Sequence, residues 1–145
     1  MKLSTKTRYG VRALVDLACR YGQGQVPLSS IAERQNISPK YLEQEFATLR
    51  RAGVLKSVKG AQGGYMLAQP ADKIYVAEVI SILEGDLDIV DPLDEENNNP
   101  LRAFLYREVY EPVGRSIKAS LENLTLADVV RYYREEQIAD NMYYI

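Results

Sequence analysis

The chain contains no histidine and a single cysteine, Cys19, among its 145 residues. Nucleophilic catalysis usually needs a histidine base beside the nucleophile, and soft metals or iron–sulfur clusters need thiolate or imidazole ligands. A lone cysteine also cannot form a disulfide within the chain, so Cys19 is either a small buried hydrophobic residue or a redox-sensing thiol. The sequence therefore predicts that the protein is not an enzyme and holds no metal or cluster cofactor.

Long apolar runs are also missing. Charged residues interrupt the apolar positions of the first 22 residues, which excludes a signal-peptide core or a membrane-spanning segment there. With 46% apolar and 26% charged residues, the composition is that of an ordinary globular chain, and the length suits one compact domain with an extended dimerisation element. We expect the protein to stay in the cytoplasm and to have no membrane partner.

The net charge is only −2, which by itself argues against a nucleic-acid partner. The distribution of charge changes this conclusion. Residues 1–69 hold eleven Lys and Arg against four Asp and Glu, whereas residues 70–145 hold seven against sixteen. The basic amino-terminal half is suited to DNA contact, and the acidic half to another task such as self-association or sensing.

Residues 28–53 have the pattern of a helix, a tight turn and a second helix. Leu28, Ile31 and Ala32 recur at helical spacing, with Ser29 and Ser30 as capping candidates, and residues 36–38 form the turn. Ser38 followed by Pro39 is a strong helix start. Along the second helix, the buried face is formed by Leu42, Phe46 and Leu49. Its opposite, polar face consists of Lys40, Glu43, Gln44, Ala47, Thr48 and Arg51. Such a face fits a major groove.

A basic hairpin follows directly. Gly53 ends the second helix, and residues 54–58 and 65–67 are short strand candidates. They flank the sequence Lys59-Gly60-Ala61-Gln62-Gly63-Gly64, whose glycines permit positive φ. The helix–turn–helix spacing alone occurs in many proteins that never touch nucleic acid. With the hairpin behind it, the segment predicts a winged helix that binds DNA.

The first helix is predicted over residues 5–21, with Val11, Leu14, Val15, Ala18 and Tyr21 on its core face. Its basic, hydroxyl-rich start can offer amides and side chains to a phosphate, or it is an ordinary solvated terminus. A fourth helix, from Val76 to Leu83 and ended by Gly85, is expected to pack beneath the winged helix.

Several stretches resemble the Rrf2 family of bacterial winged-helix repressors. They are KLSTKTRYG at 2–10, LSSIAERQNIS at 28–38, YLEQ at 41–44, LRRAGVLKSVKGAQGGY at 49–65 and ILEG at 82–85. The resemblance implies a homodimer that binds palindromic operators. Cluster-binding members of the family carry three cysteines in the segment 86–99, which has none here. Among the members of the family, the sequence looks most like the cysteine metabolism repressors.

The carboxyl-terminal half divides into three segments after the winged-helix domain of residues 1–85. Residues 86–100 form an acidic loop at the effector position; its carboxylates either hold a hard cation or are simply solvated, and they lack the spacing of a calcium-binding loop. Residues 101–124 form a dimerisation helix, with a kink or break expected near Pro112. Its apolar stripe consists of Leu101, Phe104, Leu105, Val109, Val113, Ile117 and Leu121.

The last segment, residues 125–145, is predicted to pack back on the domain or to bind a partner. Its helix starts at Thr125, with Asp128 completing a capping box, and buries Leu126, Val129, Val130 and Tyr133. The chain ends in Tyr143, Tyr144 and Ile145. This end either packs on its own dimer or, as the resemblance to the cysteine metabolism repressors implies, binds cysteine synthase.

The sequence thus predicts a mainly α fold with a small β-wing and a function as a sequence-specific DNA-binding repressor, with sulfur or cysteine metabolism genes as the suggested target. The alternative is a regulatory subunit that acts through protein contacts of its acidic half and tail. Major-groove contacts are assigned to Lys40, Tyr41, Glu43, Gln44 and Thr48, wing contacts to Lys59 and Gln62, and phosphate contacts to Ser4, Thr5, Arg8, Arg50, Lys56 and Ser57. The predicted DNA-binding set is completed by Lys2, Tyr9, Ser38, Pro39, Arg51, Gly60, Ala61, Gly63, Gly64 and Tyr65.

Overall fold

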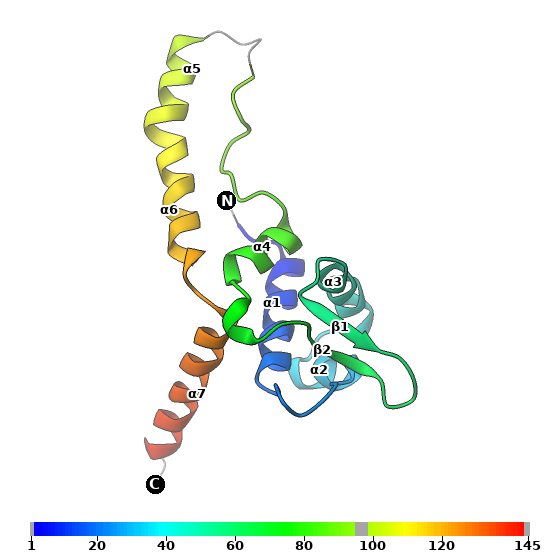
Figure 1. The fold of residues 1–145 in the computed structure, drawn as a ribbon. Helices are drawn as coiled ribbons and strands as arrows, with labels where there is room; N and C mark the ends of the chain where they lie inside the picture. Colours follow the sequence, from blue (N-terminus) through cyan, green and yellow to red (C-terminus); the bar gives the residue numbers. More distant parts are fainter. Residues whose placement is uncertain (1, 95–98, 144–145) are drawn as a thin grey trace.

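The computed structural model describes residues 2–94 and 99–143 as a helical body carrying a two-stranded sheet, from which a long arm and a final helix extend (Figure 1). The elements are α1 (Thr5–Ala18), α2 (Leu28–Gln35), α3 (Pro39–Arg51), β1 (Leu55–Val58), β2 (Gly64–Leu67), the 3-10 turn η1 (Ala71–Lys73), α4 (Val76–Glu84), α5 (Pro100–Leu105), the π-helical turn η2 (Tyr106–Tyr110), α6 (Glu111–Glu122) and α7 (Leu126–Tyr143). The predicted mainly α fold with a small β-wing is confirmed.

The hydrophobic core lies where α1 to α4 meet. Leu14 from α1, Ile31 from α2 and Phe46 from α3 are all at most 1% exposed, and Val79 and Leu83 bring α4 onto the same cluster. The predicted helical spacing therefore selects the buried face of α3 and most of that of α4. On α1 it is partly wrong, because Ala13 and Leu17 are buried while Val11 and Val15 are only half-buried. The strands pair antiparallel, with Leu55 opposite Leu67.

The first helix is shorter than predicted. α1 ends at Ala18 rather than at residue 21, and Tyr21 is 61% exposed instead of contributing to the core. The reason is the turn that follows, in which Gly22 and Gly24 have φ values of 88° and 80°. These left-handed residues turn the chain back toward Val26, which forms a bridge with the wing. Cys19 caps the helix end and is half-buried.

Pro112 does not break the long helix. α5, η2 and α6 follow one another without a gap from residue 100 to residue 122, about 35 Å at about 1.5 Å per residue. The disturbance takes another form, since the turn before the proline is π-helical and the Glu111 amide donates to the Tyr106 carbonyl. The π-helical turn is wider than an α-helical one, and it lets the helix continue past Pro112, which has no backbone N–H to donate.

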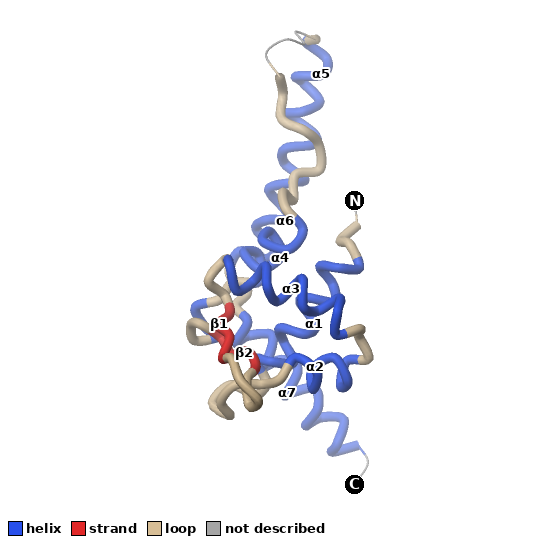
Figure 2. The backbone as a smooth tube through the Cα atoms, turned by 90° about the vertical axis from the view of Figure 1, so that its right-hand side faces the viewer, coloured by secondary structure: helices blue, strands red, loops and turns tan. Residues whose placement is uncertain are grey.

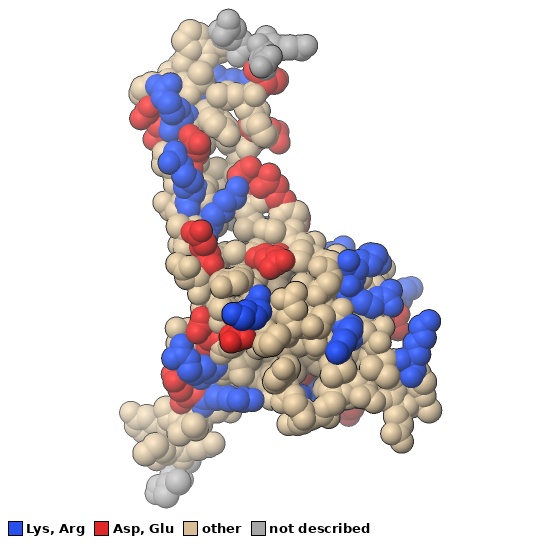
Figure 3. All heavy atoms as spheres, viewed as in Figure 1, with Lys and Arg blue, Asp and Glu red and all other residues tan. Residues whose placement is uncertain are grey.

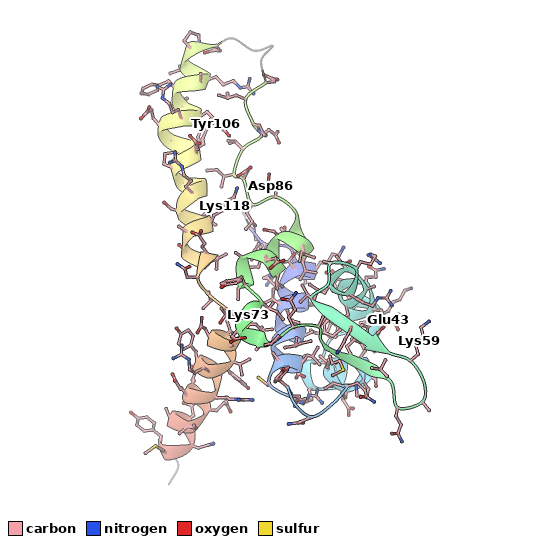
Figure 4. The ribbon with its side chains drawn as sticks, in the orientation of Figure 1. Glu43, Lys59, Lys73, Asp86, Tyr106 and Lys118 are labelled. Atoms are coloured by element: carbon pink, nitrogen blue, oxygen red, sulfur yellow. The ribbon has the colours of Figure 1, made fainter. Side chains whose placement is uncertain are left out.

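The apolar stripe of this arm is largely uncovered in the single chain. Leu101, Phe104, Val109 and Val113 are 64%, 51%, 44% and 47% exposed. The arm rises away from the body, and the segment after α4 runs beside it (Figures 1 and 2). Lys118 ties that segment to α6 by ion pairs (Figure 4).

The first turns of α7 pack back onto the body. Thr125 and Asp128 form the predicted capping box, with reciprocal bonds of 3.0 and 3.1 Å, and Leu126 and Val130 are buried. Tyr133, expected in the core, is 49% exposed because α7 leaves the body after its second turn. The predicted tail begins at Tyr143, which is 89% exposed, while Tyr144 and Ile145 lie outside the described residues. None of the helices in the described part of the chain is long and apolar enough to cross a membrane.

Candidate nucleic-acid interface

Helix α3 presents a polar face to solvent because its apolar face is fully buried in the core. Leu42, Phe46 and Leu49 are each 0% exposed, which fixes the rotation of the helix about its axis. The first turns consequently expose Lys40, Tyr41, Glu43 and Gln44, and Ser38 and Pro39 are exposed at the helix start. Thr48 is half-buried, and its hydroxyl donates to the Gln44 carbonyl at 2.9 Å. The outer face of α3 thus consists of hydrogen-bonding side chains suited to base edges.

The turn before α3 depends on a left-handed residue. Asn36 has φ 52° and ψ 50°, and the Ile37 amide donates to the Ala32 carbonyl at 3.0 Å. Asparagine tolerates this conformation better than most residues. Ser38 then starts α3 as predicted, although its side chain makes no capping bond. Ser29 and Ser30 do not cap α2 either; the Ser30 hydroxyl donates to the Pro27 carbonyl instead.

The wing places a cationic tip on the same side of the body as α3. Lys59, Gly60, Ala61 and Gln62 are exposed at the hairpin end, and Figure 4 shows Lys59 close to Glu43 of α3 in this view. The Gln62 carbonyl accepts a hydrogen bond from Gln25 Nε2 at 2.7 Å. This contact, which the sequence analysis missed, holds the tip against the loop before α2.

Three of the residues predicted to contact DNA have a role in the packing of the wing. A Cβ on Gly63 would lie 2.2 Å from the Val58 carbonyl oxygen, and one on Gly64 would lie 2.4 Å from the Val26 carbonyl oxygen. The ring of Tyr65 packs edge-on against Phe46 at 5.2 Å. Their packing accounts for these residues without any contact to DNA.

The start of α1 differs from the predicted phosphate site. The Ser4 hydroxyl accepts from the Thr7 amide at 3.1 Å and donates to Glu84 Oε2 at 2.7 Å, and the Thr7 hydroxyl also donates to Glu84. Hydrogen bonds from Thr7 and Ser4 lower the pKa of Glu84. The Glu84 carboxylate therefore lies at the start of α1, where a phosphate was expected, and the Ser4 hydroxyl donates to Glu84.

Most of the remaining phosphate candidates stay accessible. Lys2, Thr5, Arg8, Arg50, Arg51 and Lys56 are exposed, and Ser57 is half-buried. Arg8 donates to the Thr5 hydroxyl at 3.1 Å, and Arg51 donates to the Thr48 hydroxyl at 3.2 Å. Figure 3 shows Lys and Arg side chains gathered over the side of the body formed by α3 and the wing, with acidic side chains more frequent along the arm.

Two tyrosines connect α1 to the exposed face of α3. The rings of Tyr9 and Tyr41 meet edge-on at 5.8 Å, and the Arg12 guanidinium lies 5.1 Å from the centre of the Tyr9 ring. Tyr9 is half-buried in this stack. Its position supports Tyr41 rather than presenting a free side chain of its own.

A buried carboxylate lies on the inner side of α3. Glu45 is 1% exposed, and neither of its carboxylate oxygens has a hydrogen-bond partner among the described residues. Burial raises the pKa of Glu45, and Lys6 at 3.6 Å partly opposes this effect. Glu45 was not predicted to be buried because a charged side chain is rarely found in a core, although its position, three residues after Leu42 and four before Leu49, lies on the apolar face of α3.

Comparisons with known proteins agree with this geometry. Residues 3–132 match the family model Rrf2, described as an iron-dependent transcriptional regulator. The chain is 40% identical over 145 residues, all of both chains, to the HTH-type transcriptional regulator CymR of Bacillus subtilis, and 37% identical to the regulator IscR of Erwinia tasmaniensis over 97% of this chain and 85% of that one.

Solved structures give the same result. The structure of CymR, the global cysteine regulator of B. subtilis, superposes with a TM-score of 0.78 at 38% identity, covering 91% of this chain and 98% of that one. A T. potens IscR superposes with a TM-score of 0.76 at 44% identity, covering 94% and 91%. These relatives are transcriptional regulators and not enzymes, which confirms the prediction that the chain is not an enzyme.

The iron named in the family description does not fit the residues present. Iron–sulfur clusters are held by cysteine thiolates, with histidine as an occasional replacement. The chain has one cysteine, at the end of α1, and no histidine. In the segment before the arm, Asp86 and Asp88 lie 3.9 and 2.7 Å from Lys118 Nζ, so both carboxylates already share one ammonium group of the chain. Within residues 2–94 and 99–143, no three His, Cys, Asp or Glu side chains converge on a metal-sized site.

The family assignment rests on both sequence and shape. The family model covers nine-tenths of the chain, CymR of B. subtilis shares two-fifths of its residues over the full length, and the CymR structure superposes over 91% of the chain. The resemblance drawn from the YLEQ segment and the glycine-rich wing is confirmed. The chain belongs to the Rrf2 family of transcriptional regulators.

Proposed function

We propose that the protein is a homodimeric repressor that binds a palindromic operator, with one α3 in each of two successive major grooves. The observation that carries this proposal is the shared side of α3 and the wing tip, where Lys40, Gln44 and Lys59 are all exposed. A helix with an outward polar face, flanked by a cationic hairpin, matches the docking mode of helix–turn–helix proteins.

Base readout is assigned to the first turns of α3. Gln44 can pair with adenine through two hydrogen bonds, and Glu43 can accept from the cytosine amino group. Lys40 and Tyr41 flank them, and Lys59 with Gln62 reaches the groove beside the wing. Arg50, Arg51, Lys56 and Arg8 supply phosphate contacts, which position the protein without reading sequence.

The arm supports the dimer. Its exposed apolar stripe, including Phe104 and Val113, would cost free energy in water unless a second copy covered it. Two arms packed about a two-fold axis bury the stripe on itself and set two α3 helices one DNA turn, about 34 Å, apart.

The regulated genes are proposed to serve sulfur or cysteine metabolism, on the strength of 40% identity to CymR. The exposed end of α7 with Tyr143 is available for an enzyme partner, and cysteine synthase is the candidate. A regulator of this kind acts on DNA in the cytoplasm, and its function requires no metal. Removal of residues 143–145, followed by calorimetry against cysteine synthase, tests the partner; undiminished binding of the truncated chain contradicts it.

Operator binding is tested by footprinting the purified protein on genomic DNA and measuring affinity for the selected fragment at several salt concentrations. We expect Glu43→Ala to relax base preference, whereas Glu78→Ala, exposed on α4, leaves it unchanged. For six or more phosphate contacts, affinity should fall about a thousandfold between about 50 and 200 mM salt. A flat salt profile, or no selected fragment, contradicts DNA recognition.

The dimer has its own test. Val113→Asp places a charge in the stripe and should give a monomer by sedimentation together with a loss of operator affinity. Ala119→Asp adds the same charge to an exposed position of α6 away from the stripe and should leave the dimer intact. A dimer that survives Val113→Asp excludes the proposed interface.

A further inference from the structure

A cavity of about 730 Å³ lies between α1, α2 and α7, on a part of the body that the proposed DNA contacts do not use. The carboxyl-terminal half of α1 lies between the other two helices (Figure 1). Three arginines, Arg12, Arg20 and Arg34, line this cavity, with Asp16 as the acidic residue of its wall. Its volume is in the range of small-molecule sites.

Asp16 neutralises only part of this positive charge. Its side chain is 3% exposed, and it accepts from Arg34 Nη2 at 2.7 Å, Arg20 Nη1 at 3.2 Å and Gln35 Nε2 at 2.7 Å. Burial alone would raise the pKa of Asp16, but the hydrogen bonds from Arg34 and Gln35 and the charges of Arg20 and Arg34 hold it below its ordinary value. One carboxylate therefore faces three guanidinium groups.

The arginines keep donors for a ligand. Arg12 Nη2 donates to the Gln35 carbonyl at 3.1 Å and stacks on Tyr9, which positions the group. No acceptor among the described residues takes a bond from Arg12 Nη1, Arg20 Nη2 or Arg34 Nη1. The free N–H groups of these separate guanidinium groups can each donate a charge-assisted hydrogen bond to a carboxylate oxygen. The rim carries one charge of each sign. The Glu33 carboxylate interacts electrostatically with Arg34, and the Arg134 guanidinium donates to the Cys19 carbonyl, so these two rim charges offset each other.

The rest of the wall is mostly apolar, with Gln23 as its one further polar residue among the described residues. Val15, Cys19 and the aromatic ring of Tyr133 line the cavity beside the guanidinium groups. An inorganic anion would fill little of this volume and leave the apolar surface wet. An anion with a carbon skeleton would meet both kinds of wall.

We propose that this cavity binds a small organic acid, with its carboxylate held by Arg12, Arg20 and Arg34 and its carbon skeleton against Val15 and Tyr133. Arg34 and Gln35 end α2 immediately before the left-handed turn into α3, and Tyr133 belongs to α7. The ligand thus joins α1, α7 and the first helix of the helix–turn–helix. Occupancy of the site does not depend on DNA binding.

Cys19 provides the measurement, because it is the only cysteine of the chain and lies in the cavity wall. The rate of Cys19 alkylation by a small maleimide is measured on the full chain with increasing succinate, sulfate and succinamide, and succinate binding is measured by calorimetry. Succinate should slow alkylation saturably, whereas succinamide, of similar shape without charge, should not. Sulfate should protect much less at equal concentration.

Variants separate the site from general salt effects. Arg12→Gln should weaken half-maximal protection by succinate about tenfold, while Arg131→Gln, an exposed arginine of α7 outside the cavity, should change nothing. If Arg12→Gln does not fold, Arg20→Gln replaces it. Absence of protection, equal protection by succinamide, equal protection by sulfate, or unchanged succinate binding in Arg12→Gln each overturns the proposal. Because the readout needs no DNA, its failure is distinct from a failure of operator binding.

Discussion

The ammonium group of Lys6 lies 3.6 Å from the carboxylate of Glu45, and the two side chains differ sharply in exposure, at 50% and 1%. Lys6 belongs to α1 and Glu45 to α3, so the pair spans the interface beneath the DNA-facing helix. Gly10, on the next turn of α1, lies between α3 and α4: a Cβ there would be in ordinary contact with Glu45 Cβ at 3.5 Å but only 2.8 Å from Leu83 Cδ1 of α4. A distance of 3.6 Å is too long for a strong hydrogen bond, so Glu45 is poorly compensated for its burial.

We therefore predict that Glu45→Leu stabilises the protein by about 1 to 3 kcal/mol at neutral pH, since an apolar side chain removes the cost of burying a charge. Urea unfolding measures the difference. Glu43→Leu on the exposed face of the same helix is the control and should change stability by less than about 0.5 kcal/mol. Destabilisation by Glu45→Leu would mean that the ion pair with Lys6 holds the two helices together.

The same residue predicts a pH dependence. The pKa of Glu45 is raised in the folded state above its ordinary value of 4.5, so its favourable contribution is complete below that value and is lost as pH rises through the folded pKa. The stability advantage of Glu45→Gln over the natural chain should thus grow from acidic to neutral pH. Unfolding curves of both chains across this range measure it, and a constant difference contradicts the raised pKa.

Asp16→Asn should destabilise the protein by about 2 to 4 kcal/mol, because Arg20, Arg34 and Gln35 lose a charged acceptor in a buried position. The pKa of Asp16 is lowered in the folded state, so its contribution is present above about 3.8 and is lost as pH falls through the folded pKa. The natural chain should approach the variant in stability at low pH. Asp72→Asn, exposed in η1, should leave the urea midpoint unchanged.

Ser4→Ala should cost about 1 kcal/mol, because the hydroxyl caps α1 through the Thr7 amide and donates to Glu84. Ser29→Ala is the matched change at the start of α2, where no side-chain capping bond exists, and should be close to neutral. Thermal unfolding of both variants makes the comparison. Equal losses would show that the contacts of Ser4 with Thr7 and Glu84 do not stabilise α1.

Gly64→Ala should destabilise the wing by about 1 to 3 kcal/mol, since the new Cβ would lie 2.4 Å from the Val26 carbonyl oxygen. Hydrogen exchange at the Val26 and Tyr65 amides, which pair with each other's carbonyls, reports the local opening. Ala61→Ser at the exposed tip should leave exchange unchanged. Protection of Val26 and Tyr65 that survives Gly64→Ala would contradict the tight packing of the wing on the loop before α2.

The sequence by itself determined the elements whose signals are local. Ser38 and Pro39 start α3, the apolar spacing of Leu42, Phe46 and Leu49 sets its buried face, and Gly53 ends its last turn with φ 83°. These features depend on residues a few positions apart, so periodicity and backbone preference suffice to find them. The family motifs coincide with these same helices and the hairpin.

Only the tertiary structure decided the features that join distant parts of the chain. Glu84 caps α1 across 80 residues, Asp16 gathers Arg20 with two residues of α2, and Arg134 of α7 reaches the carbonyl of Cys19. The exposure of Tyr133 likewise depends on how far α7 follows the body. No local pattern contains this information, because the free energy of such contacts arises only when the helices have packed together.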